Sequence, residues 1–480
     1  QGNPEQQKGQ GDRDPRPEMA YDPAVVHVPL SYPCIPGGGM RSIRSILALA
    51  LLAAAPAAAQ FSQYTAPGTL LQRTTSRREQ MELALENARW RVGPFRLSPW
   101  FAIRDAAYVS DVFSGSSGDV PSGLEEEDPD FTISVGAGLQ GFVPFGSKTF
   151  VTFDALPQYV YWQDHEERRR LNGYYGAGLF AFFNRLNGEL TVRRAEEQGV
   201  ITPEFEQRIH SRQDRIAGVV DLEITPALFA FVSGDTFELD TLTEDLGDDP
   251  RLPPFDQLDR QERVLRGGLE YRSGEKIKLA VGVERSEAEF SLDESGRDRS
   301  NSGTAPIVAA AYTGPRLQLD AGLAFRSLEP EPGSEFVPFD ETTGHVRAAL
   351  TPRWRLSYNL YASRGLDYTL DESYSHYTQD RAGFAISSRL GRASSVNLFG
   401  ETGVHSYVIS PLAAPGTPSR EDDFLAYGTS IQLQVKDNYR LIFGVARTEL
   451  ESDLPGIDRS LTVFQTSVEI SAFGGAFTVR

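Results

Sequence analysis

The chain has few of the residues and motifs on which most enzymes and metal proteins depend. Its single cysteine, Cys34, lies near the N-terminus, so the rest of the chain cannot form a disulfide framework, a cysteine-ligated metal site or a cysteine nucleophile. The six histidines are scattered without metal-ligand spacing, and the sequence contains no nucleophile elbow, zinc-protease, phosphate-loop or dinucleotide motif. We therefore predict that the protein is not an enzyme and uses no cofactor or metal.

Long hydrophobic runs are missing too, with one exception. A helical membrane protein needs repeated apolar stretches of about 20 residues, whereas the only long apolar run here is Ile46 to Ala59. This run follows two arginines after Met40 and ends in three alanines before Gln60, which is the pattern of a secretory signal peptide. We predict a signal peptide at 40–59, with Met40 as the true start, and interpret 1–39 as non-native upstream sequence or a disordered lead.

An excess of basic residues is absent as well. The formal net charge is −19, which argues against nucleic acid as a partner because nucleic-acid binders present a basic face. The composition, 40% hydrophobic and 24% charged, suits a soluble protein and a porin equally, since only alternate strand residues of a porin face lipid. Composition therefore leaves a soluble β-sandwich or soluble barrel open as alternatives.

From about residue 95 onward, segments of about ten residues alternate apolar with polar or small residues. Tight turns rich in Gly, Pro, Asn and Asp alternate with longer loops, many of them acidic. The tight turns are 144–148, 184–188, 225–227, 273–276, 313–316, 351–353, 391–394 and 436–438. The longer loops include 114–130, 241–256, 291–303, 329–341 and 410–423. The pattern predicts an all-β fold, a transmembrane antiparallel up-and-down β-barrel of about 18 strands over 95–480.

The alternation also predicts which side chains face the lumen. In KIKLAVGVE, Leu279 and Val281 share one face while Lys278 and Glu284 share the other. A charge on the lipid face costs about 2–4 kcal/mol near the bilayer midplane, so we expect the charged face to line the lumen. The basic residues with this parity are Arg266, Arg272, Lys276, Lys278, Arg316, Arg326, Arg353, Arg355, Arg381 and Arg389, offset by Asp221, Glu223, Glu270, Glu284 and Asp320. Such a lining could attract acidic solutes, or its charges could simply pair across the wall.

One segment before the barrel has helical rather than β periodicity. Residues 60–94 would form a periplasmic lead, within which Ser76 to Trp90 has a capping box of Ser76 and Glu79 before an apolar face. We predict a short helix there. It could dock onto a periplasmic partner or have no special role.

The segment Arg91 to Phe113, RVGPFRLSPWFAIRDAAYVSDVF, resembles the entry of an outer-membrane barrel family found in bacterial exopolysaccharide and capsule operons. That family opens with a glycine, alternating hydrophobic residues and a proline, and continues through a strand to a tyrosine and an acidic–aromatic run. The matching residues are Gly93, Phe95, Leu97, Pro99, Tyr108, Asp111, Val112 and Phe113.

The resemblance implies a pore in the outer membrane of a Gram-negative bacterium that takes part in polysaccharide export. Its partners would be outer-membrane lipid and lipopolysaccharide, the polysaccharide, and periplasmic export components. A general or solute-specific diffusion porin and a barrel-anchored surface scaffold are the alternatives. The end of the chain departs from the aromatic ending common in such barrels, because Phe477 lies three residues before Arg480.

Overall fold

The computed structural model describes a single run of strands that begins at Trp90. The described residues are 88, 90–109, 130–199, 202, 204, 209–242, 255–274, 276–291, 298–353, 355–391, 393–436, 439–455 and 457–470. The predicted signal peptide and most of the predicted helix lie outside them. Within the described part of the chain, no helix is long and apolar enough to cross a membrane.

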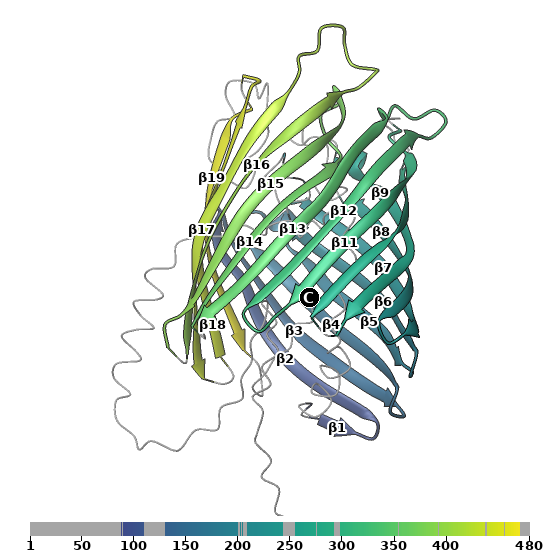
Figure 1. The fold of residues 1–480 in the computed structure, drawn as a ribbon. Coiled ribbons are helices and arrows are strands. Elements are labelled where there is room, and N and C mark those ends of the chain that lie inside the picture. Colours follow the sequence, from purple (N-terminus) through teal and green to yellow (C-terminus); the bar gives the residue numbers. More distant parts are fainter. Residues whose placement is uncertain are drawn as a thin grey trace, which may run out of the picture. The chain divides into compact units, whose positions relative to one another are not determined.

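The described elements are almost all strands (Figure 1). They are β1 Trp90–Val92, β2 Phe95–Val109, β3 Asp130–Phe145, β4 Thr149–Trp162, β5 Arg170–Phe182, β6 Leu186–Gly199, β7 Ile209–Thr225, β8 Leu228–Thr241, β9 Arg260–Ser273, β10 Ile277–Phe290, β11 Asn301–Thr313, β12 Leu317–Pro330, β13 Phe339–Arg353, β14 Leu356–Asp367, β15 Tyr374–Arg389, β16 Ser394–Ile409, β17 Glu421–Lys436, β18 Tyr439–Ser452 and β19 Arg459–Ile470. Two short 3-10 helices, η1 Glu166–Arg168 and η3 Phe255–Leu258, lie in the connections.

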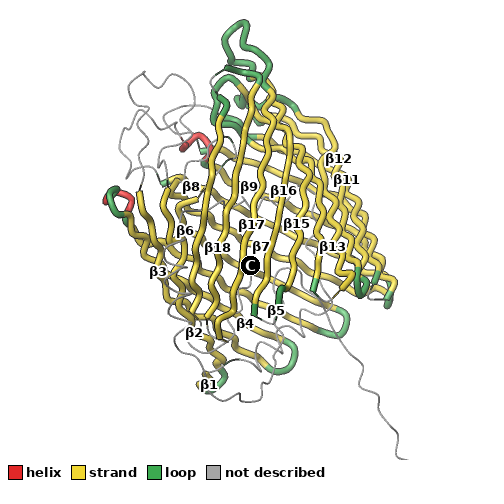
Figure 2. The backbone as a smooth tube through the Cα atoms, turned by 90° about the vertical axis from the view of Figure 1, so that its left-hand side faces the viewer, coloured by secondary structure: helices red, strands yellow, loops and turns green. Residues whose placement is uncertain are grey.

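Each long strand from β2 to β19 pairs antiparallel with the strand that follows it in sequence. Within the described residues, β19 also pairs with β2, through four residue pairs and with a register irregularity between Thr466 and Val468. Short turns join the strands at one end and longer loops at the other, here called the turn end and the loop end (Figure 2). The prediction of 18 up-and-down antiparallel strands is confirmed, and the seam between β19 and β2 is the least extensively paired junction.

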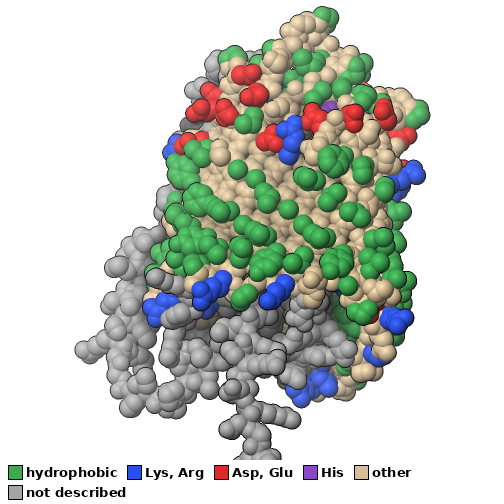
Figure 3. All heavy atoms as spheres, in the orientation of Figure 1, with side chains coloured by type: hydrophobic (Ala, Val, Ile, Leu, Met, Phe, Trp, Pro, Cys, Tyr) green, Lys and Arg blue, Asp and Glu red, His purple; other side chains and the backbone are tan. Residues whose placement is uncertain are grey.

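The large apolar side chains of the strands point outward, away from the lumen that the sheet surrounds. On β10, Leu279, Val281 and Val283 are 48%, 56% and 57% exposed. Glu284 of the same strand has the opposite parity and is fully buried. Figure 3 shows these apolar side chains as a belt, with Asp and Glu gathered above it towards the loop end and Lys and Arg below it towards the turn end. A continuous exposed apolar belt bounded by charged side chains is the surface of a β-barrel of the outer-membrane type.

The strands are longer than the sequence pattern predicts. We expected segments of about ten residues, the length needed to cross a bilayer, but β10 has 14 residues and β7 has 17. On the outward face of β10 the apolar series ends at Val283 and continues with Arg285 and Glu287. These strand ends extend beyond the belt, where charged outward side chains carry no lipid penalty.

The predicted helix does not reach Trp90. Ala88 has no regular structure, and Trp90 begins β1, which pairs with Phe95 to Leu97 of β2. The chain turns between β1 and β2 at Gly93, whose φ of +58° is a left-handed conformation that glycine adopts readily. This hairpin was not predicted.

Most turns lie where the sequence predicts them, but two are displaced. The turn predicted at 184–188 lies earlier, because β6 already begins at Leu186, and the turn predicted at 351–353 lies later, because β13 continues to Arg353. In both cases the ladder pairing extends into residues that have turn-like composition.

Candidate functional site

The inner wall of the barrel carries charges that pair with one another across neighbouring strands. Glu284 of β10 is fully buried and accepts hydrogen bonds from Arg266 Nε of β9 at 2.7 Å and from Arg326 Nη2 of β12 at 2.5 Å. Both arginines are less than one-tenth exposed. One carboxylate therefore holds two arginines against the inner face, and the pairing reaches from β9 to β12.

Arg272 and Arg381, two further arginines predicted to line the lumen, are also paired. Arg272 forms ion pairs with Glu270 and, at 3.3 Å, with Asp221, and its guanidinium lies 3.7 Å from the centre of the Phe229 ring. Arg381 lies 3.3 Å from Glu401 of β16.

Glu401 also accepts a hydrogen bond from the Tyr361 hydroxyl of β14, across Gly383 of β15. A Cβ at position 383 would lie 2.5 Å from Tyr361 Cζ, so glycine at this position lets the tyrosine lie flat along the wall. His345 Nε2 of β13 and Asp320 Oδ1 of β12 are 2.7 Å apart. The wall is therefore polar, with its charges largely matched.

The remaining predicted lumen residues lie at or near the turn end. Lys276, Arg316 and Arg355 are in the turns themselves and are exposed, so they do not form part of the strand wall. They were predicted to line the lumen because the alternation of apolar and polar residues continues in the sequence past the last paired residue of each strand. Lys278 and Arg389 lie on strands close to the turn end and are partly buried, and Arg353 is the last residue of β13.

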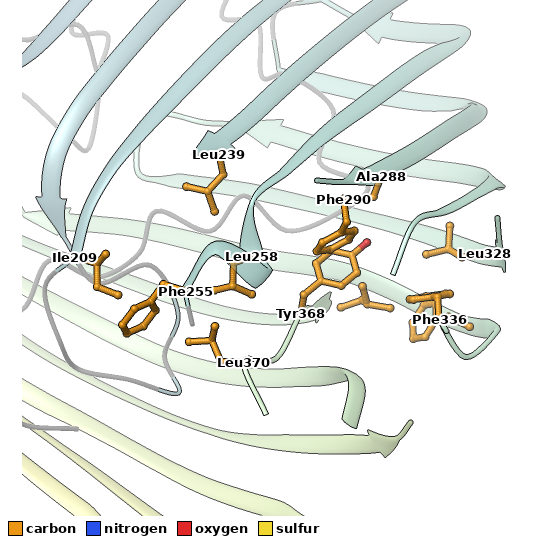
Figure 4. Close-up of a cluster of buried hydrophobic side chains, with 12 residues drawn as sticks. Ile209, Leu239, Phe255, Leu258, Ala288, Phe290, Leu328, Phe336, Tyr368 and Leu370 are labelled. Carbon is orange, nitrogen blue, oxygen red and sulfur yellow. The ribbon is translucent and has the colours of Figure 1, made fainter. Parts of the chain in front are cut away.

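The loop end contains a second region, a cluster of buried apolar side chains (Figure 4). Phe255 and Leu258 of η3 are each 1% exposed and Phe336 of the loop 331–338 is 2% exposed. The cluster, here called the loop cluster, consists of Ile209, Leu239, Phe255, Leu258, Ala288, Phe290, Leu328, Phe336, Phe339, Leu366, Tyr368 and Leu370. Several members, such as Leu239 and Phe290, have the inward parity of their strands, so the loops fold inward over the lumen.

Polar contacts connect loops that are far apart in the barrel. Glu204, in the connection between β6 and β7, is 2% exposed and accepts hydrogen bonds from Thr369 Oγ1 at 2.6 Å and from the Leu370 backbone N–H at 2.8 Å. Thr369 and Leu370 belong to the loop between β14 and β15. This contact therefore joins two connections separated by eight strands of the sheet.

Two buried arginines extend this network. Arg299, 3% exposed, donates from Nη2 to the Gln257 carbonyl at 2.8 Å and from Nη1 to the Thr369 carbonyl. Arg420, 6% exposed, pairs with Asp422 at 2.6 Å and Asp371 at 3.4 Å. Because each arginine bonds to separate segments, the loops behave as one packed unit and not as independent solvated connections.

Burial changes the ionisation of several groups in this unit. Burial raises the pKa of the Glu204 carboxyl, although Arg420 opposes the shift. Burial also raises the pKa of Asp259, just after η3, to about 7, and the nearby carboxylates Asp240 and Asp256 act in the same direction. His376 is stacked on Phe336 with ring centroids 4.8 Å apart, and burial, assisted by the charge of Arg299, lowers its pKa to about 4.

Sequence reasoning missed the loop cluster. It identified 241–256, 291–303 and 329–341 only as longer loops, because acidic residues, Gly and Pro dominate them. The signal was present in isolated aromatic and aliphatic residues, Phe255, Phe336 and Leu370, inside otherwise polar segments. Among the described residues, no group of His, Cys, Asp and Glu has the arrangement of a metal site.

The residues that carry the family resemblance are only partly within the described chain. Gly93 forms the β1–β2 turn, and Pro99 lies within β2 opposite Leu139. Tyr108 is near the end of β2. Asp111, Val112 and Phe113 lie outside the described residues.

Comparison with known proteins gives structural similarity alone. No protein-family model and no curated protein matches the chain. A BenF-like porin from Pseudomonas fluorescens Pf-5 is 11% identical, with a TM-score of 0.44 over 79% of this chain and 99% of that chain. Acinetobacter baumannii OccAB3 is 10% identical, with a TM-score of 0.43 over 79% and 98%. A bacterial polysaccharide outer membrane secretin is 10% identical, with a TM-score of 0.31 over 78% and 98%. At these TM-scores, the similarities assign neither a family nor a function to this chain.

Proposed function

We propose that the protein is an outer-membrane β-barrel pore that takes part in the export of an extracellular polysaccharide and performs no covalent chemistry. The observation that carries the pore assignment is the polar, charge-paired inner wall behind an outward apolar belt. Inward ionic groups such as Arg266 and Glu284 suit a lumen that contains water and polar solutes. The polysaccharide is supported by the resemblance of the entry segment around Gly93 and Pro99.

The loop cluster makes the proposed pore a gated one. Its apolar side chains and its Glu204 contacts close loops over the lumen at the loop end. A closed mouth suits a channel that opens for a particular cargo better than a permanently open diffusion porin. A solute-specific porin remains the second candidate, because a paired polar wall with an inward-folded loop also suits passage of a small solute.

Planar-bilayer conductance of the purified full chain tests the proposal. Phe255→Ala should remove about 3–5 kcal/mol from the packing of the loop cluster. The equilibrium constant for loop opening, and with it the open probability of a mostly closed pore, should therefore rise by about a hundredfold to a few thousandfold. Leu323→Ala, which shortens an outward side chain in the belt, is the matched control and should leave the open probability unchanged.

The cargo separates the candidates. Block of the Phe255→Ala pore by long oligosaccharides, with little block by monosaccharides, supports polysaccharide export. Free passage of small sugars in a liposome-swelling assay, without block by long chains, supports the diffusion porin. No conductance in either protein, with a folded barrel, would leave the surface scaffold as the function.

A further inference from the structure

The turn end of the barrel is basic. Of the eight turns between the long strands, six contain a lysine or arginine. These residues are Lys148, Arg185, Lys276, Arg316, Arg355 and Arg392. The first five are described and exposed, and Figure 3 shows Lys and Arg gathered below the apolar belt.

Basic side chains also occupy the inner face at this end. Lys278 of β10, Arg389 of β15 and Arg440 of β18 all lie within two residues of a turn and have the parity opposite to the exposed apolar side chains. Lipid headgroups surround the barrel from outside and do not reach this inner face. The basic residues therefore form a rim around the lumen entrance, and not only a band against the membrane.

The contact of Lys148 in its turn differs from the contacts of arginines near the loop end. Lys148 Nζ donates to Asn184 Oδ1 at 2.9 Å, a neutral partner in the neighbouring turn. Near the loop end, the outward arginines pair with carboxylates, as Arg194 does with Asp214 at 2.6 Å and Arg263 with Glu289 at 3.0 Å.

The connections at the loop end contain more acidic than basic residues, although some include arginines such as Arg299 and Arg420. The connections 331–338, 368–373 and 453–458 contain acidic residues and no lysine or arginine. An anionic chain would be attracted to the turn end and repelled from the loop end, so we expect it to bind at the turn end, which faces the periplasm in outer-membrane barrels.

We propose that the rim at the turn end is the entry site for an anionic polysaccharide, whose acidic groups bind Lys and Arg of the turns and of the inner face. This inference rests on the proposed export function and names its substrate class. It predicts that binding is salt-dependent, because the turn residues are exposed and exposed ionic contacts are screened.

Titration of the detergent-solubilised full chain with fluorescent oligogalacturonate tests the entry site, and a dextran oligomer of equal length supplies the neutral comparison. A neutral detergent keeps anionic lipid out of the measurement. The wild type should bind the acidic oligomer several-fold more tightly than dextran. The combined variant Arg316→Gln, Arg355→Gln, Arg389→Gln should bind it about tenfold more weakly. The control variant Arg194→Gln, Arg263→Gln, Arg447→Gln, altered near the loop end, should bind like the wild type. Heat-modifiable migration on a denaturing gel verifies that each barrel is folded.

Three outcomes would overturn the entry site. Equal binding of dextran and oligogalacturonate would leave a polysaccharide pore without preference for acidic cargo, so the export function would survive. Binding of neither oligomer would count against both proposals. If the turn-end variant still bound oligogalacturonate fully but lost adhesion to phosphatidylglycerol vesicles, the basic rim would be a contact for lipid headgroups.

Discussion

The belt and the loop cluster contain similar apolar residues and use them in opposite directions. In the belt, Leu279 and Val281 are about half exposed and point outward, where hydrocarbon replaces water. In the loop cluster, Phe255 and Leu258 are 1% exposed and point inward, away from water. Apolar side chains of one chain therefore face hydrocarbon in one region and pack away from water in the other. Strand parity and the path of the loops decide which of the two a side chain does, and residue type does not.

The two regions should consequently respond differently to mutation. The wall depends on a continuous ladder of backbone hydrogen bonds, so damage to it affects the whole barrel. The loop cluster depends on packing and a few polar contacts between connections, such as Glu204 with Leu370. It should open without unfolding the strands, as locally less stable units do in other proteins.

The largest effect is expected inside the wall. Glu284→Ala would leave Arg266 and Arg326 buried without their shared carboxylate, at a cost of about 3–5 kcal/mol in the free energy of unfolding. Urea unfolding from lipid vesicles measures this. The control is Glu289→Ala, on the same strand as Glu284. It removes an exposed partner of Arg263 and should cost no more than about 1 kcal/mol. Equal effects of the two variants would mean that water reaches Glu284 freely.

A somewhat smaller effect is expected on the outer face of the wall. Val281→Arg places a charge in the middle of the apolar belt and should destabilise the inserted barrel by about 2–4 kcal/mol. Glu287→Arg changes the same face of the same strand beyond the belt and should have little effect. The measurement is again urea unfolding from vesicles. A tolerated Val281→Arg would contradict the assignment of this face to lipid.

Much of the wall could be predicted from the sequence because hydrocarbon and water impose a period of two on every strand. The apolar parity of Leu279, Val281 and Val283 and the tight turns at 146–148 and 226–227 follow from local patterns alone. The strand ends could not be predicted, because Arg285 and Glu287 have the composition of a loop although they continue the ladder. Pairing of the backbone, not side-chain polarity, decides where those strands end.

The loop cluster could not be predicted because its contacts join connections distant in sequence. Nothing in the residues near Glu204 indicates that its carboxylate accepts hydrogen bonds from Thr369 and Leu370, more than 160 positions away. The lumen arginines were a mixed case. The inward parity of Arg266 and Arg326 could be predicted, but their shared partner Glu284 depends on the register of four strands, β9 to β12.

The smallest effect is expected from pH acting on the loop cluster, because its shifted groups oppose one another. The raised pKa values of Asp259 and Glu204 act in one direction and the lowered pKa of His376 acts in the other. The pKa of Asp259 is raised to about 7 from its usual 3.8, so ionisation opposes closure, and stability of the closed cluster falls as pH rises from about 4 to 7. The pKa of His376 is lowered to about 4 from its usual 6.5, so stability is full above pH 6.5 and falls as pH decreases towards 4. The wild-type open probability should therefore change little between pH 5 and pH 7.5. Relative to the wild type, Asp259→Asn should favour opening at low pH and His376→Gln should favour opening at high pH, each by about 1–2 kcal/mol. Single-channel recordings of the three proteins across this range provide the measurement. Identical pH dependence in the wild type and both variants would show that the closed loops do not bury these two groups.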